Sequence, residues 1–409
     1  MKRTTLRLLA MLMVVALLSG GMVACSKGNE ETDDTESSAL TEGTEDNMNE
    51  NEEPKPGGEN QEPEKEEEEE DDLPEKSIDL YLIAGQSNAS GTSKITDRAA
   101  AYAWAPSLEN GFTNIHYAGN SRSTTEHRDL DWQKVTLGLG IRNQDYVGPE
   151  AGMAKALSAY YNEESGKDAG FIKYAMGGSA LLNKNAENWA SPSYVATLDE
   201  SEIYRGKTGV LYANFLAQVE KNVSELVTYG GYTKINICGL YWMQGCNDRS
   251  KPTEYQPAFV AFAADIRRDL SALMQEYTGT TEDCGASEMP IVVGTISQTQ
   301  NLSSSTAEAT NRAFIEMQKG LPSVVENCYV VDNSQFAISG YNSADPSSPI
   351  VYGSDRWHWN QADALKIGEN VGKLFLTLLP REEIPQKGLT VAEGGTLPQI
   401  DVSDFDLWK

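Results

Sequence analysis

Buried strand patterns alternate with helix patterns along most of the chain, and this alternation restricts the fold more than any other feature. Apolar runs predict strands at 78–85, 170–176, 234–245, 290–297 and 328–332. Apolar residues at helical spacing predict helices at 149–161, 209–230, 254–277, 305–321 and 360–379. Strands that are apolar along their whole length fit a sheet covered on both faces, and parallel strands need helical crossovers. The sequence therefore predicts an α/β fold: a three-layer αβα sandwich with a central, mostly parallel five-stranded sheet.

Two long stretches lack such a pattern. Residues 88–147 and 179–204 are rich in Asn, Trp and Tyr, and we expect irregular insertions there. Their aromatic residues suit either a platform on which sugar rings stack or the cores of the insertions themselves. These residues are Trp104, Trp132, Trp189 and Tyr194. Residues 381–409 read as an irregular C-terminal tail that packs back on the body.

The N-terminus predicts export. A basic start is followed by an apolar run, 8–18, that is too short to span a membrane. The segment MVAC resembles the lipobox of bacterial lipoproteins, with Met22 where Leu is usual. We expect a signal peptide over 1–24 and a lipid on Cys25. The lipid would anchor the protein to a membrane of the cell envelope, facing the periplasm or the cell surface. The alternative is an ordinary signal peptide with an incidental cysteine.

An acidic segment follows, over 25–76. Its composition of Glu, Asp, Asn, Thr, Pro and Gly offers little to bury, which predicts a disordered tether. The chain has a net charge of −28, and about −18 of it lies in this segment. The acidity is thus mostly a property of the tether. It argues against nucleic-acid partners and says little about the substrate.

The cysteines and histidines suggest no metal or redox motif. CxxC and HExxH are absent and the chain has only three histidines, so we expect neither a metal nor another cofactor. Cys238 and Cys246 lie at opposite ends of one predicted strand, about 26 Å apart at about 3.3 Å per residue, and cannot bond each other. Cys284 and Cys328 lie in or beside loops and could pair in an oxidising compartment.

The first predicted strand ends in the tetrapeptide GQSN, which contains Ser87. In open α/β sheets, ligands bind beyond the carboxyl ends of the strands, and Ser87 lies at such an end. Gly177 and Gly178 follow the second predicted strand, and Asn247 follows the third. A DxxH segment at 355–358 precedes the last helix. We expect these four segments to converge on one rim of the sheet.

Their residue types suit nucleophilic catalysis. A serine hydroxyl is a poor nucleophile until a base takes its proton. His358 can be that base, and Asp355 can bond the ring nitrogen that faces away from Ser87. The Ser87 backbone N–H, a backbone N–H from the glycine pair, and the side-chain amide of Asn247 are candidates for an oxyanion hole.

The order of the motifs resembles a known family. GQSN at 85–88, GPE at 148–150, the glycine pair, WMQGCND at 242–248 and DxxH at 355–358 resemble the SGNH (GDSL-like) hydrolases. More closely, they are similar to carbohydrate esterases of the sialate O-acetylesterase and acetylxylan esterase type. The GxSxG pattern of α/β-hydrolases is absent. The resemblance implies a flavodoxin-like esterase domain, which we place at 77–380.

The resemblance also implies roles for single residues. Ser87 would be the nucleophile, Asp355 and His358 its partners, and Asn247 the oxyanion-hole amide, with Gly177 or Gly178 beside it. Weaker, substrate-binding roles fall to Gln86, Glu150 and Gln244. The family often reads WxQGExD, and here Cys246 replaces the Glu, which leaves the sugar ester open.

The sequence thus predicts a serine carbohydrate esterase. It would remove O-acetyl groups from an acetylated glycan through an acetyl-enzyme, without a cofactor. Two alternatives stay open: an SGNH lipase or arylesterase acting on non-sugar esters, and a non-catalytic glycan-binding lipoprotein.

Overall fold

The computed structural model describes residues 76–182, 186–302, 306–344, 351, 354–379 and 407–408. The described residues contain a mixed eight-stranded sheet in which six neighbouring strands are parallel and each edge strand is antiparallel. In sheet order the strands are β10 (Leu407–Trp408), β9 (Cys328–Val331), β8 (Ile291–Gly294), β7 (Lys234–Met243), β1 (Ser77–Gly85), β6 (Asp168–Met176), β3 (Ile115–Arg122) and β4 (His127–Lys134).

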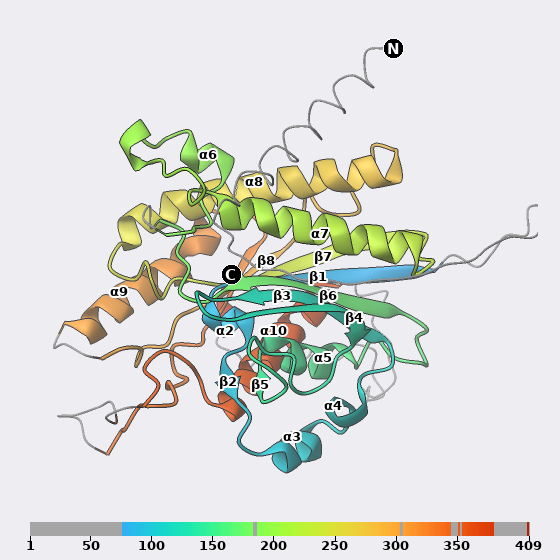
Figure 1. The fold of residues 1–409 in the computed structure, drawn as a ribbon, viewed down its shortest axis with the longest axis horizontal. Coiled ribbons are helices and arrows are strands. Elements are labelled where there is room, and N and C mark those ends of the chain that lie inside the picture. The colour runs from blue at the N-terminus through green and yellow to red at the C-terminus, as the bar shows by residue number, and fades with distance from the viewer. Residues whose placement is uncertain are drawn as a thin grey trace, which may run out of the picture. The chain divides into compact units, whose positions relative to one another are not determined.

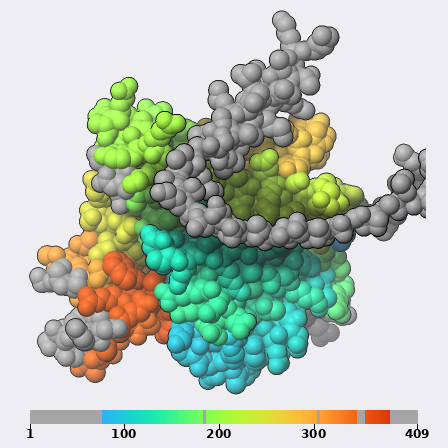
Figure 2. Space-filling model, in the orientation of Figure 1, coloured from blue at the N-terminus to red at the C-terminus, as the bar shows by residue number. Residues whose placement is uncertain are grey.

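The predicted α/β fold is confirmed, and the strand count is corrected. The five predicted strands are present in the spatial order β6-β1-β7-β8-β9, which is the 2-1-3-4-5 order of flavodoxin-like folds. The sheet is larger because β3, β4 and β10 extend its edges. β3 and β4 lie within 88–147, so the expectation of irregular structure there is wrong. In β4, exposed residues alternate with partly buried ones, as expected at a sheet edge. This segment, blue to teal, forms much of the lower surface in Figure 2.

Helices cover both faces of the sheet (Figure 1). On one face lie α5 (Pro149–Leu157) and α10 (Gln361–Leu378), and on the other lie α7 (Val210–Thr228) and α8 (Pro252–Thr278). α9 (Ala307–Gly320) packs beside α8. The smaller elements are α2 (Ser87–Ser90), β2 (Ser93–Lys94), α3 (Arg98–Trp104), α4 (Ser107–Asn110), β5 (Tyr146–Val147), α6 (Pro192–Val195), η1 (Glu200–Glu202) and η2 (Leu321–Ser323).

Local signals explain where the long helices begin and end. Pro149 opens α5, where a missing backbone N–H has no cost. Gly279 ends α8 in the left-handed conformation. The Asn360 side chain caps α10 by accepting the Asp363 N–H. These signals agree with the predicted helix positions.

Glycines let α5 and α10 approach very closely. A Cβ atom added to Gly152 would lie 2.1 Å from the Leu365 carbonyl oxygen. One added to Gly368 would lie 2.1 Å from the Pro149 carbonyl oxygen. The two backbones are therefore in contact, which fixes the start of α10 and the DxxH segment just before it.

Trp189 belongs to the hydrophobic core. It is fully buried, and its ring packs edge-on against Trp242 and Tyr174, with centroids 5.2 and 5.8 Å away. Of the two interpretations open for the aromatic residues, the structure therefore favours core for Trp189. The other three, Trp104, Trp132 and Tyr194, are partly buried and pack against the same core.

The predicted pairing of Cys284 and Cys328 is wrong, since both are free thiols. Cys284 lies beside β7, where its carbonyl accepts the Ile237 N–H. Cys328 opens β9, and β8 lies between β7 and β9.

No described helix combines the length and apolar character needed to cross a membrane. The predicted signal peptide, Cys25 and nearly all of the tether lie outside the described residues.

Candidate active site

The site is built where the strand order reverses. β1 lies between β6 and β7, and such a switch point opens a crevice beyond the strand ends. The chain leaves β1 at Gly85, whose φ is +138°. A Cβ atom there would lie 2.1 Å from the Met243 carbonyl oxygen, so only glycine fits between the two strand ends. This close approach sets the position of Ser87.

Hydrogen bonds of Gln86 link this turn to the loop after β7. Its N–H donates to the Met243 carbonyl (2.9 Å), and its side-chain oxygen accepts the N–H groups of Gly245 (3.1 Å) and Cys246 (3.0 Å). The side chain is buried. These contacts favour a positioning role over the substrate contact that the sequence suggests.

Ser87 is half-buried and opens the short helix α2. Its carbonyl accepts from the Gly91 N–H and the Thr92 hydroxyl, both at 3.1 Å. Its own hydroxyl bonds none of the described residues. Its N–H lies at the helix start, where backbone donors have no partner within the helix. Both groups are thus available to a ligand.

Asp355 and His358 are in direct contact. The Asp355 Oδ2 atom lies 2.7 Å from His358 Nδ1, while Oδ1 accepts the N–H groups of Trp357 (2.8 Å) and His358 (3.1 Å). Burial alone would raise the pKa of Asp355, but the hydrogen bond and charge of His358, with the two N–H groups, lower it below its usual range. The carboxylate therefore stays ionised and orients the ring.

A hydrogen bond joins the serine segment to the histidine segment. The Asn88 side chain donates to the Trp357 carbonyl at 3.3 Å, across 269 positions of sequence. Asn88 directly follows Ser87, and Trp357 directly precedes His358. Nε2 of His358 has no partner among the described residues. Asn88 is the last residue of the GQSN motif, and no spacing in the sequence indicates its contact with Trp357.

The two glycines after β6 differ. Gly177 lies beside Ser87, since a Cβ atom added to it would be 3.7 Å from the Ser87 Cβ. Its N–H, however, donates to the Arg122 carbonyl at 2.6 Å. The Gly178 N–H has no partner in the described part of the chain, and the Gly178 carbonyl accepts from the Asn247 amide. Of the two glycines, Gly178 is therefore the one whose backbone N–H is available to a ligand, beside Asn247.

Buried polar side chains hold the loops behind these donors. Asp248 accepts the N–H of Leu181 (2.7 Å) and the side-chain amide of Gln244 (2.9 Å). Burial raises the pKa of Asp248, against these hydrogen bonds. Gln244 is fully buried, so its contacts also favour positioning over direct substrate binding.

Glu150 lies beneath α2 in a buried ion pair. Its Oε2 atom is 3.0 Å from Lys173 Nζ, and both side chains are fully buried. Lys173 Nζ is also 3.4 Å from the carbonyls of Ser90 and Leu139. Glu150 Oε1 accepts the Gly148 N–H at 3.1 Å. The pair thus supports the helix that carries Ser87. In the sequence, Lys173 is the one charged residue of an otherwise apolar predicted strand, and this feature could have indicated a buried ion pair.

Cys246 occupies the position where the family often has Glu. Its thiol donates to the Gln300 side chain at 2.9 Å, and burial raises its pKa to about 12. The thiol is therefore protonated and not a nucleophile. Its carbonyl accepts from Arg249 at 2.8 Å, and the Arg249 guanidinium stacks on the Trp357 ring at 5.1 Å. This stacking supports the segment next to His358.

A family model for sialic acid-specific acetylesterases, a group of carbohydrate esterases, matches residues 77–373. The chain belongs to this family. Membership makes it a carbohydrate esterase, and it confirms the predicted family. No curated protein sequence matches the chain.

Solved structures resemble the described fold at low identity. NanS is 16% identical, over 75% of this chain and 98% of that chain, with a TM-score of 0.46. A protein from Arabidopsis thaliana is also 16% identical, over 73% and 98%, with a TM-score of 0.41. A variant of Axe2, an acetyl xylan esterase from Geobacillus stearothermophilus, is 13% identical, over 78% and 99%, with a TM-score of 0.30.

Proposed function

We propose that this esterase removes O-acetyl groups from a glycan with Ser87, His358 and Asp355 as its catalytic residues. The observation that carries the proposal is the 2.7 Å contact between Asp355 and His358, in a segment bonded through Trp357 to Asn88, the neighbour of Ser87. This arrangement leaves one ring nitrogen and one hydroxyl uncommitted on adjoining segments.

The chemistry follows from these groups. His358 Nε2 takes the proton of the Ser87 hydroxyl, whose oxygen attacks the acetyl carbonyl. The oxyanion accepts hydrogen bonds from the N–H groups of Ser87 and Gly178 and from the Asn247 amide. The carbon–oxygen bond to the sugar breaks, and the sugar oxygen takes the proton from His358. Water then attacks the acetyl-enzyme with His358 as base, which releases acetate and restores Ser87.

Substitution of the nucleophile tests the proposal. Ser87→Ala should lower kcat for 4-nitrophenyl acetate by about 10⁴-fold or more, since loss of a catalytic serine removes the covalent path. Ser323→Ala, at an exposed serine in η2, is the matched control and should retain full activity. An unchanged rate in Ser87→Ala would exclude the mechanism and favour a non-catalytic glycan-binding protein.

The acyl group and the sugar need a separate comparison. Rates on O-acetylated sialic acid and acetylated xylan, set against esters of longer acyl chains, distinguish a glycan acetylesterase from a lipase or arylesterase. The proposal expects a clear preference for acetyl esters of sugars. Faster hydrolysis of long-chain esters would favour the alternative.

For the location of the protein, we propose a lipid on Cys25 that holds the esterase at the cell envelope. Cells fed a clickable fatty acid should label the wild type and leave Cys25→Ala unlabelled and soluble. Cys284→Ala is the control and should label normally. A wild type without label would point to an ordinary cleaved signal peptide.

A further inference from the structure

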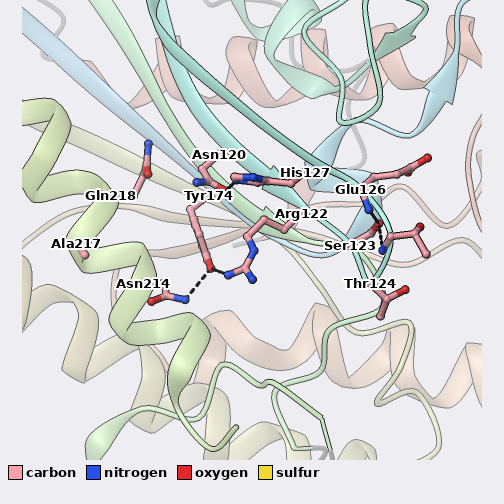
Figure 3. Close-up of a pocket in the computed structure, with 11 residues that line it drawn as sticks. Asn120, Arg122, Ser123, Thr124, Glu126, His127, Tyr174, Asn214, Ala217 and Gln218 are labelled. Carbon is pink, nitrogen blue, oxygen red and sulfur yellow. Dashed lines mark hydrogen bonds between the residues drawn. The ribbon is translucent and has the colours of Figure 1, made fainter. Parts of the chain in front are cut away.

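Two cavities lie at opposite ends of the β3–β4 strand pair. The first opens between the β3–β4 turn and α7 (Figure 3) and adjoins the nucleophile, since the Cβ position of Gly177 lies 3.4 Å from the Ser123 Cβ and 3.7 Å from the Ser87 Cβ. The second, called the distal cavity below, has a volume of about 530 Å³. Its lining side chains include Lys76, His116, Asp131, Trp132, Glu225 and Tyr229.

The distal cavity is remote from the candidate active site. Lys76 precedes β1 and Ser87 follows it, so the 9 residues of this strand separate the cavity from the nucleophile. At about 3.3 Å per residue, the strand is roughly 30 Å long. A single sugar unit in the distal cavity therefore cannot reach Ser87, whereas a long glycan chain can occupy both places.

Two aromatic side chains line the distal cavity. Trp132 is partly buried against the core, and its indole N–H donates to the Asn222 carbonyl at 3.3 Å. A Cβ atom added to Gly170 would lie 3.1 Å from its ring, so the strand backbone supports the ring from one side. Tyr229 directly follows α7, is 86% exposed, and its hydroxyl bonds none of the described residues. Tyrosine and tryptophan with an apolar ring and a polar tip are typical of binding surfaces.

Polar groups without a full set of partners lie beside these rings. His116 is half-buried, and its ring nitrogens have no partner in the described part of the chain. Burial lowers the pKa of His116 below its usual value, so the ring is neutral near pH 7 and offers one donor and one acceptor. The carboxylates of Asp131 and Glu225 lie 3.4 and 3.8 Å from Lys221 Nζ, which leaves further acceptor positions on each.

The charges at the distal cavity favour an uncharged ligand over an anionic one. Lys76 Nζ lies 4.0 Å from the centre of the Tyr232 ring and donates to the Gly230 carbonyl at 3.0 Å. The one lysine of the lining is therefore already engaged. Asp131 and Glu225 add two carboxylates, which would repel an anionic ligand.

We infer that the distal cavity is a second glycan-binding site, which holds an uncharged stretch of a glycan chain away from the catalytic residues. The rings of Trp132 and Tyr229 suit the apolar faces of sugar rings, while His116 and the two carboxylates suit sugar hydroxyls. The chain belongs to a family of carbohydrate esterases, so a glycan is the ligand it meets. Binding there would raise the effective concentration of a polymeric substrate at the active site. The inference does not depend on which residues are catalytic.

Binding is tested in the Ser87→Ala background, by affinity electrophoresis in gels that contain arabinoxylan, a neutral polymer, or polysialic acid, an acidic one. Arabinoxylan should retard the protein more than polysialic acid. Adding Tyr229→Ala should weaken binding to arabinoxylan about 2- to 10-fold, because one stacking ring is lost, and adding Trp132→Ala as well should weaken it about 10- to 100-fold. Tyr229→Phe keeps the ring and should keep most of the affinity. Tyr204→Ala, at another exposed tyrosine, is the matched control.

Rates give a second measurement. With serine present at position 87, Tyr229→Ala should lower kcat/KM on acetylated arabinoxylan and leave kcat/KM on 4-nitrophenyl acetate unchanged, because only the polymer reaches the distal cavity. No retardation by arabinoxylan, retardation that survives loss of both rings, or stronger retardation by polysialic acid would each overturn the inference. Dependence of 4-nitrophenyl acetate hydrolysis on Ser87 tests the proposed function separately, so the two failures are distinguishable.

Discussion

Two pairs of a carboxylate and a basic side chain lie near α2, the short helix that carries Ser87, and they differ in exposure. The side chains of Glu150 and Lys173, beneath α2, are both 0% exposed. Those of Asp355 and His358, at the rim, are 40% and 21% exposed. In the first pair the lysine nitrogen has three oxygen neighbours, namely Glu150 and two carbonyls. In the second pair one ring nitrogen has no described partner.

The difference in exposure distinguishes a pair that supports α2 from a pair that can transfer a proton. A fully surrounded ion pair cannot pass a proton to a substrate, but it resists any movement of the groups that it bonds, here the Ser90 carbonyl at the end of α2. A pair with one free nitrogen can move a proton at that atom, while its carboxylate keeps the ring in place. Burial of the first pair and openness of the second therefore match their two roles.

The largest expected effect comes from breaking the Asp355–His358 pair, called the rim pair below. Asp355→Asn should lower kcat for 4-nitrophenyl acetate by about 10³- to 10⁴-fold, because the amide no longer holds the ring in the tautomer that accepts the serine proton. Asp363→Asn, on the first turn of α10, is the control and should stay near wild type. A loss of less than tenfold in Asp355→Asn would show that this pair does not orient the base.

Breaking the buried pair should act on stability. Lys173→Met should lower the free energy of unfolding by about 3–5 kcal/mol, because it leaves the Glu150 charge buried without its partner. The double variant Lys173→Met/Glu150→Gln should lose less, since no charge remains buried. Arg312→Met, at the exposed ion pair on α9, should cost at most about 1 kcal/mol.

Urea unfolding of these three variants provides the measurement. A Lys173→Met variant as stable as Arg312→Met would mean that water reaches the pair, and the contrast with the rim pair would then disappear.

The smallest effect is a pH dependence of stability from the rim pair. The pKa of Asp355 is lowered in the folded state, so its contribution is full above the ordinary aspartate pKa of about 3.9 and is lost as pH falls through the lower, folded value. The difference in Tm between wild type and Asp355→Asn should shrink as the pH falls from about 5 to below about 4. A difference that stays constant down to pH 2 would contradict the lowered pKa.

The alternation of buried strands and helices was enough to predict the central fold. It predicted five strands in their correct places because each is apolar throughout and bounded by a helix. The sequence did not predict β3 and β4. The edge strand β4 exposes polar side chains, and β3 beside it mixes polar and apolar residues within an Asn-rich stretch. The disulfide prediction failed because the positions of Cys284 and Cys328 along the chain do not show whether their side chains meet in the fold.

In the candidate site too, sequence spacing predicts some contacts, while others depend on how distant elements pack. Contact between Asp355 and His358 follows from a spacing of three residues, which one turn of backbone can close. The partner of Lys173 and the bond from Asn88 to Trp357 depend on how distant elements pack, and no spacing indicates them. Which glycine keeps a free N–H depends on the Arg122 carbonyl, which belongs to a strand that the sequence did not predict.

The glycine contacts between α5 and α10 set a limit on redesign. Gly152 and Gly368 are positions that a protein engineer would replace by alanine to gain helix propensity. Here the added methyl group would meet a backbone oxygen and push the helices apart, carrying the DxxH segment away from the serine. Alanine at Gly152 or Gly368, introduced to raise thermal stability, would therefore displace the DxxH segment from Ser87 before it unfolded the domain.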